Sequence, residues 1–179
     1  MILGIVGPIG SGKDTAADYI SRKYGYEIVS FRDIVREVTE GKGMEPSREN
    51  MQDVARECRA RYGEDYFSKR ALEKGVALLK NGRKVLFKEM RTKGDADLLR
   101  KEFGSGIKII LVESGKRTRY ERLKARGRLG DPKTFGEFHA QETREREMHF
   151  TESFSFADTA VKNNGTLKEL HDRIDEVVK

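Results

Sequence analysis

The sequence of 179 residues contains no tryptophan and only one cysteine, Cys58. A lone cysteine excludes an internal disulfide and a thiolate metal cluster, so we expect a buried or incidental thiol. No apolar run approaches the roughly 20 residues of a membrane-spanning helix. The first residues also lack the basic segment, apolar segment and cleavage site of a signal peptide. These absences predict a soluble, cytoplasmic protein with no membrane partner.

Internal repeats, low-complexity tracts and linkers are absent too, and the length suits a single domain over residues 1–179. Charged residues make up 37% and the formal net charge is +6. Because Lys and Arg alternate with Asp and Glu along most of the chain, solvated helix faces explain most of this charge. The positive excess also suits a cleft for polyphosphate, and nucleic acid stays a possible but not a favoured partner. A monomer and a homodimer both remain open.

The hydrophobic pattern predicts strands that alternate with helices along the whole chain. The expected strands are 1–6, 26–31, 84–87, 107–112 and 157–161. The expected helices are 12–24, 33–40, 46–62, 64–80, 95–103, 115–127, 134–149 and 167–178. This alternation predicts an α/β fold of three layers, in which a parallel sheet of about five strands carries helices on both faces. The stretches at 31–80 and 117–150 exceed a simple crossover and are candidates for covering a substrate.

The strongest motif lies directly between the first strand and the first helix. It reads Gly7-Pro8-Ile9-Gly10-Ser11-Gly12-Lys13-Asp14-Thr15, with the Gly-x4-Gly-Lys spacing of a P-loop. Glycines let successive backbone N–H groups turn toward phosphate oxygens, and the helix N-terminus adds partial positive charge. Lys13 supplies a mobile cation for a transferred phosphoryl group. The motif therefore predicts that these residues bind ATP.

One position departs from the usual P-loop pattern. Asp14 stands where most P-loops carry a Ser or Thr whose hydroxyl binds magnesium. A carboxylate is a hard oxygen ligand that could hold the metal directly or through water, and Thr15 could rearrange instead. We therefore expect ATP and Mg2+ as cofactors, with Asp14 as a metal ligand.

Other classes of P-loop protein fit the sequence less well. Thr92-Lys93-Gly94-Asp95 matches the guanine-reading motif of GTPases on paper, but no Asp-x-x-Gly lies between it and the P-loop. We interpret this segment as the N-terminal cap region of a helix. The chain also lacks room for the machinery of a large motor-type ATPase.

A second group of residues resembles the acceptor site of the nucleoside monophosphate kinase superfamily. Asp33 and Arg36 follow the second strand, and the segment resembles the Gly-Asp-x-Leu-Arg motif of adenylate kinases. The resemblance implies that Arg36 grips the acceptor phosphate, and that Asp33 faces the metal, caps the helix or serves as a base for a hydroxyl acceptor. Arg91, after the third strand, is implied as a second phosphate ligand, since guanidinium groups bind phosphate in a bidentate manner. Exposed helix and turn arginines remain the alternative for both.

The helix at 115–127 resembles the Arg-x-x-x-Arg helix that precedes the lid in the same superfamily. The resemblance places Arg122 at the donor adenine and phosphates, and Arg126 at the transferring phosphoryl group. Arg128, in a lid at about 126–135, is implied as a further catalytic cation, and Arg144 as an acceptor contact. Several arginines converging from a mobile lid suit phosphoryl transfer, which depends on positioning and charge neutralisation.

The segment 157–167 resembles the Ala-Asp-x-x-Ile-x-Asn-x-Gly-(Ser/Thr) ending of dephospho-CoA kinases. The resemblance implies that Asn164 and Gly165 lie against the donor base. An Asn-Gly turn followed by Thr166 as a helix N-cap explains the same residues structurally, and both interpretations can hold.

Nearly the whole chain resembles a small, mostly archaeal family of P-loop nucleotide-kinase-like proteins related to dephospho-CoA kinase and adenylate kinase. After the third strand that family usually reads Asp-Gly-x-Arg, whereas this chain reads Lys88-Glu89-Met90-Arg91. Either Glu89 substitutes as a metal-binding acid, or Asp14 or Asp33 takes over that work, or catalysis is weakened. Our hypothesis is that Asp14 partly compensates.

The sequence as a whole predicts an ATP-dependent phosphotransferase for a nucleotide or nucleotide-like acceptor, of the nucleoside monophosphate or dephospho-CoA type. The acceptor would bind at about 31–80, and Asp14 and Glu89 would hold the metal. The expected catalytic residues are Lys13, Asp33, Arg126 and Arg128. The alternatives are a P-loop ATPase that serves as a regulatory or assembly factor, and an RNA-associated protein that uses the same basic cleft.

Overall fold

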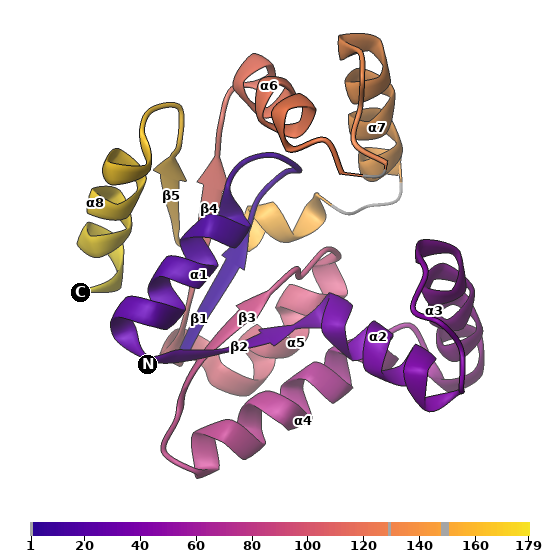
Figure 1. Cartoon of the computed structure of the whole chain (residues 1–179). Helices are drawn as coiled ribbons and strands as arrows, with labels where there is room; N and C mark the ends of the chain where they lie inside the picture. Colours follow the sequence, from indigo (N-terminus) through magenta and orange to yellow (C-terminus); the bar gives the residue numbers. More distant parts are fainter. Residues whose placement is uncertain (1, 129, 148–150) are drawn as a thin grey trace.

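A five-stranded, all-parallel sheet forms the centre of the computed structural model, which describes residues 2–128, 130–147 and 151–179 (Figure 1). The strands are β1 (Ile2–Val6), β2 (Tyr26–Ser30), β3 (Lys84–Lys88), β4 (Ile107–Glu113) and β5 (Thr159–Lys162). Their order in the sheet is β2-β3-β1-β4-β5, so β1 is the central strand. The predicted parallel α/β fold is confirmed.

The helices follow the predicted order, with boundaries shifted by a few residues. They are α1 (Lys13–Tyr24), α2 (Phe31–Gly41), α3 (Arg48–Tyr62), α4 (Tyr66–Lys80), α5 (Lys93–Phe103), α6 (Lys116–Arg126), α7 (Phe135–Glu147) and α8 (Leu167–Val178). Two 3-10 turns, η1 (Gly104–Gly106) and η2 (Glu152–Phe156), were not predicted. The expected continuation of α7 through 148 and 149 lies outside the described residues. None of the described helices is long and apolar enough to cross a membrane.

Alternation along the strands divides the core between the two faces of the sheet. Leu86 points to the face covered by α1 and α8, whereas Val85 and Phe87 point to the opposite face, which is covered by α2, α4 and α5. Cys58, on α3, is buried in the apolar cluster that contains Phe87, which agrees with the expected buried thiol. Burial of both faces explains the near-continuous apolar runs that predicted the strands.

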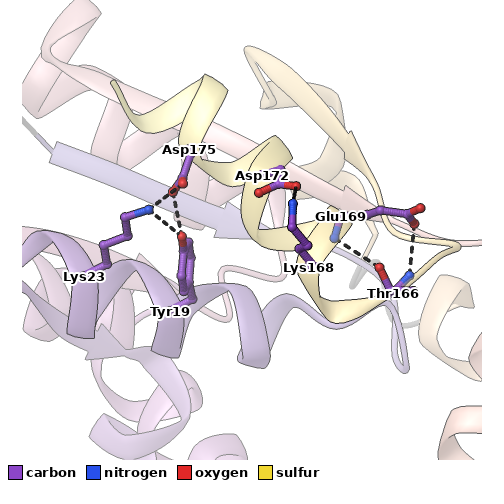
Figure 2. Close-up of polar contacts among 7 residues, drawn as sticks. All are labelled: Tyr19, Lys23, Thr166, Lys168, Glu169, Asp172 and Asp175. Carbon is purple, nitrogen blue, oxygen red and sulfur yellow. Dashed lines mark hydrogen bonds and ion pairs between the residues drawn. The ribbon is translucent and has the colours of Figure 1, made fainter.

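Helix α8 is fixed to α1 by hydrogen bonds at the edge of the apolar cluster that these two helices form with Leu86 (Figure 2). Asp175 accepts hydrogen bonds from the hydroxyl of Tyr19 at 2.8 Å and from the ammonium of Lys23. Thr166 caps α8 in a reciprocal capping box with Glu169, so the predicted N-cap is confirmed. The same arrangement of Thr92 and Asp95 at the start of α5 confirms that this segment is a helix cap.

Helices α6 and α7 stand at the carboxyl end of the sheet, beside the loop that joins β1 to α1 (Figure 1). Tyr120, Leu123 and Phe138 form a small apolar cluster of their own between these two helices, with Ile9 of the loop packed against it. The apolar contact of α6 and α7 with the loop after β1 is therefore made by Ile9, in a cluster separate from the main core. Residue 129 of the predicted lid lies outside the described residues.

Candidate functional site

The loop from β1 to α1 has the backbone geometry that phosphate binding requires. Gly12 is the N-cap of α1 in a left-handed conformation with φ 92°, and no side chain caps the helix. The first backbone N–H groups of α1 therefore have no side-chain acceptor and remain donors for an anion. A Cβ atom at position 12 would lie 2.3 Å from Nδ2 of Asn163, so only glycine fits.

The carbonyl oxygens of this loop are bound from outside by side chains of neighbouring elements. Arg119 donates to the carbonyl of Ile9 at 3.2 Å, and Nδ2 of the buried Asn163 donates to that of Ser11 at 2.8 Å. Arg122 adds a longer contact to the Ser11 carbonyl at 3.5 Å. These contacts fix the shape of the loop, in which the Ser11 N–H also donates to the Pro8 carbonyl at 3.1 Å. The Ser11 hydroxyl is buried and has no partner among the described residues.

Three residues predicted to contact the nucleotide meet beside the P-loop. Arg122 donates to the carbonyl of Asn163 at 3.0 Å, which ties α6 to the loop after β5. The Asn164 side chain accepts from the backbone N–H of Gly115 at 2.8 Å and thereby fixes the same loop to the start of α6. Gly165 has no room for a Cβ atom, because it would overlap the carboxylate of Glu169. The structure therefore brings Arg122, Asn164 and Gly165 together; their contact with a nucleotide stays a prediction.

Charges from three segments act on Lys13: α1, the residues that follow β3, and α7. Burial lowers the pKa of its ammonium, while Asp14 and Glu89 raise it and Arg91 lowers it further. Glu145 of α7 also acts on this pKa and raises it. Sequence reasoning missed Glu145, because α7 is rich in charges and nothing in the local pattern distinguishes the one that faces the P-loop.

Asp14 forms an ion pair with Lys88, whose ammonium lies 3.3 Å from the carboxylate. Lys88 points to the α1 face because it follows Leu86 by two residues at the end of β3. Its side chain is only 18% exposed, whereas that of Asp14 is 52% exposed. Burial alone would raise the pKa of Asp14, but the ammonium groups of Lys13 and Lys88 hold it below its usual range. This pair joins two residues that lie far apart in the sequence.

Glu89 turns the other way, toward β2. Its carboxylate accepts a hydrogen bond from the Ser30 hydroxyl at 2.7 Å, and the same hydroxyl caps α2 by accepting from the Asp33 N–H. The N-cap of α2 is thus Ser30. The suggestion that Asp33 caps this helix is wrong. Glu89 has φ 67° and is the only non-glycine residue with positive φ in the described ranges. This unfavourable backbone conformation concentrates strain at the edge of the site.

The remaining predicted arginines have different surroundings. Arg36 pairs with Asp33 at 2.7 Å on an exposed part of α2. Arg126 pairs with Asp131 and also contributes to the lowered pKa of Asp14, so it lies near the P-loop. The backbone N–H of Arg128 donates to Asp131 as well, at 2.9 Å. The side chains of Arg128, in this turn, and of Arg144, on α7, are exposed.

A further arginine, absent from the sequence prediction, links the P-loop to α7. Arg119 is only 4% exposed and forms an ion pair with Glu142 of α7. It also donates to the Ser114 carbonyl at 3.0 Å and stacks over the Phe138 ring, 5.2 Å from its centroid. Helix α6 carries six Lys or Arg side chains, so only burial identifies this one as a positioning residue.

The side chains at the metal position of P-loop NTPases do not fit a magnesium ion held in the usual manner. That ion is normally held by the Ser or Thr after the P-loop lysine and by an acid at the end of a neighbouring strand. Here these positions are Asp14 and Lys88, and they bind each other. Glu89, the other predicted ligand, is engaged by Ser30. Among the described residues no group of three or more His, Cys, Asp or Glu is arranged to hold a metal.

Comparison with known proteins agrees with this geometry. The family model described as an AAA domain matches residues 6–139. A UPF0200 protein of Thermococcus kodakarensis is 34% identical over 179 residues, which cover 99% of this chain and 96% of that protein. A UPF0200/UPF0201 protein of Archaeoglobus fulgidus is 32% identical over 99% of this chain. This chain spans 54%, about half, of the length of that second relative.

Solved structures share the fold at low sequence identity. Dephospho-CoA kinase from Campylobacter jejuni has a TM-score of 0.61 at 14% identity, over 99% of this chain and 94% of that one. Shikimate kinase from Bacteroides thetaiotaomicron has a TM-score of 0.61 at 10% identity, over 99% and 96%. The fold is therefore that of the P-loop kinases. The predicted resemblance to an archaeal nucleotide-kinase-like family is confirmed, and the chain belongs to the UPF0200 family.

Proposed function

We propose that this protein is an ATP-dependent phosphotransferase that acts on a small phosphorylated acceptor of the nucleotide type. The observation that carries the proposal is the position of Lys13, at the start of an uncapped helix and within electrostatic reach of Arg91. Phosphoryl transfer requires little covalent chemistry from the protein and depends on positioning and charge neutralisation. This P-loop, with cations from β3 and the lid around it, supplies both.

On the donor side, the triphosphate would lie across residues 7–15 and the base would lie toward the loop after β5. Arg122 and Asn164 would form the wall of that region, and their hydrogen bonds to backbone atoms support a rigid wall. A rigid wall lowers the conformational cost of binding, because the side chains are positioned before the nucleotide arrives.

On the acceptor side, Arg91 would bind a phosphate close to Lys13. Arg36 would be a second contact, and an arriving phosphate would compete with Asp33 for its guanidinium group. A phosphate oxygen needs no strong general base as a nucleophile. A ribose hydroxyl would need one, and Asp33, released from Arg36, is the candidate.

The lid would complete the site after both substrates are bound. Arg126 is held by Asp131, so it would have to change partner to reach the transferring phosphoryl group. Arg128 and Arg144, exposed on the same part of the molecule, would follow it. Closure of these segments would exclude water and favour transfer over hydrolysis.

The experiment measures ADP release and product mass with ATP and a panel of acceptors: nucleoside monophosphates, deoxynucleotides and dephospho-CoA. We expect one acceptor class to stimulate ADP release and to gain one phosphoryl group. Lys13→Met should reduce turnover on the order of 100-fold or more. Lys101→Met, which changes an exposed lysine of α5, is the matched control and should leave turnover unchanged. Absence of a phosphorylated product with every acceptor would refute the phosphotransferase.

A second candidate is an ATPase that acts without an acceptor, as a regulatory or assembly factor. The pairing of Asp14 with Lys88 favours it, because the acid usually found at the end of the neighbouring strand is missing. The same assay separates the two functions. Release of ADP that depends on Lys13 and is insensitive to all acceptors would support the ATPase.

A further inference from the structure

The two positions whose side chains hold magnesium in most P-loop NTPases are occupied here by an acid, Asp14, and a base, Lys88, in contact with each other. The register of the sheet fixes this arrangement, since Lys88 lies opposite Ile5 of β1 on one side and opposite Ser30 of β2 on the other. Lys88 is therefore anchored at the carboxyl end of an interior strand, next to the point where β1 enters the P-loop. With 18% of its side chain exposed, it has little freedom to leave.

The electrostatics of this position favour a polyphosphate over a divalent cation. Two ammonium groups, Lys13 and Lys88, lie beside the same carboxylate of Asp14. A magnesium ion placed among them would meet repulsion from both and would have to separate Asp14 from its partner. A phosphate oxygen is instead attracted by both ammonium groups, which outnumber the carboxylate of Asp14 beside them.

The hydrogen-bonding capacity of Lys88 leads to the same conclusion. An ammonium group has three N–H donors and no acceptor. Asp14 takes one of them at 3.3 Å, which leaves donors for phosphate oxygens. In P-loop NTPases, neutralisation of the phosphate charge and bridging of its oxygens are the work of the metal.

We propose that the ammonium group of Lys88 takes the place of the metal ion, so that this protein binds nucleoside di- and triphosphates without magnesium. Asp14 positions that ammonium group and is not a metal ligand. The inference rests on nucleotide binding by the P-loop, which is part of the proposed function, but not on phosphoryl transfer.

The test is a calorimetric titration of the full chain with ADP and with the non-hydrolysable analogue AMP-PNP, in EDTA and in excess Mg2+. We expect the affinity in EDTA to equal or exceed that in Mg2+. If Mg2+ raised the nucleotide affinity of the wild type by more than about 3-fold, the proposal would be overturned, since this would show positive coupling between metal and nucleotide. This measurement needs no variant.

Variants then locate the effect. Lys88→Met keeps the length of the side chain without its charge and should lose on the order of 10-fold to 100-fold of the affinity in EDTA. Lys84→Met, at the exposed start of the same strand, is the matched control and should bind like the wild type. The double variant Asp14→Ser with Lys88→Asp restores the usual metal-binding pair and should bind more tightly in Mg2+ than in EDTA. Circular dichroism confirms that each variant is folded.

Unchanged binding of a folded Lys88→Met variant in EDTA would refute the role of Lys88. Failure of the wild type to bind nucleotide in either buffer would refute both this inference and the proposed function. Binding that requires Mg2+ would overturn the inference alone and leave the phosphotransferase standing.

Discussion

Replacement of Arg119 by methionine should destabilise the protein more than replacement of any exposed arginine on the same helix. The side chain is 4% exposed, and its partner Glu142 is 13% exposed. Removing one member of a buried ion pair costs about 3–5 kcal/mol. Here the Glu142 carboxylate would keep only the weaker, exposed Lys116 at 3.6 Å, so the lower end of that range applies. Two hydrogen bonds to backbone carbonyls are lost as well. We therefore expect the free energy of unfolding to fall by about 3 kcal/mol or more.

The control is Arg117→Met, two residues earlier on α6. Arg117 is 77% exposed and pairs with Glu121 at 3.1 Å across one turn of the helix, a contact worth less than about 0.5 kcal/mol. Urea unfolding followed by circular dichroism measures both variants. The double variant Arg119→Met with Glu142→Met should recover much of the loss, because it removes the poorly compensated carboxylate.

The position of the Arg119–Glu142 ion pair also predicts which part of the protein loses stability. Arg119 joins the P-loop to α7, and α6 and α7 share only a small apolar cluster. Amide exchange in α7 should therefore accelerate in Arg119→Met even where global unfolding changes less than expected. Equal unfolding free energies for Arg119→Met and Arg117→Met, together with unchanged exchange in α7, would refute the reasoning.

Three further predictions follow from single residues. Glu89→Gly should be about 1 kcal/mol more stable than Glu89→Ala in urea unfolding, because φ 67° is unfavourable for any residue with a Cβ atom; the reverse order would contradict that conformation. Gly12→Ala should cost about 2 kcal/mol and weaken nucleotide binding in calorimetry, since the residue has φ 92° and its Cβ atom would meet Asn163. Hydrogen bonds from Lys23 and Tyr24 lower the pKa of Asp175 to about 2, below its unfolded value of about 3.9. The stability that Asp175 adds is thus present above about pH 4 and lost as the pH falls through about 2, so wild type and Asp175→Asn should converge in acid unfolding curves.

The parts of the fold that could be predicted are those encoded in short stretches of sequence. The inner strands β1, β3 and β4 are largely buried and read as apolar runs, and the P-loop motif fixes a strand, a loop and a helix within about fifteen residues. Helix caps such as Thr92 and Thr166 depend on residues three positions away, so they too were evident. The short turn η2 was missed because its residues carry neither a helical nor a strand period.

The parts of the site that could not be predicted depend on contacts across the sheet. Arg119 and Glu145 differ from their charged neighbours only in burial and direction, which the local pattern does not reveal. The pairing of Lys88 with Asp14 requires the register of β3 against β1, which depends on the whole sheet. Lys88 and Glu89 are neighbours in the sequence but have partners on different elements, Asp14 of α1 and Ser30 of β2.

The two departures from the usual P-loop pattern are therefore explained together and not separately. Asp14 alone would place an uncompensated carboxylate beside the phosphate cradle, where it would repel the nucleotide. Lys88 alone would place a largely buried ammonium group at the end of β3 without a counter-charge on the P-loop helix. In contact at 3.3 Å, the carboxylate of Asp14 balances one of the two ammonium groups beside it and leaves a positive excess, so each substitution makes the other tolerable. The sequence suggested that Asp14 compensates for a missing acid as a metal ligand; the geometry favours a different compensation, in which Asp14 balances the lysine that replaced the acid.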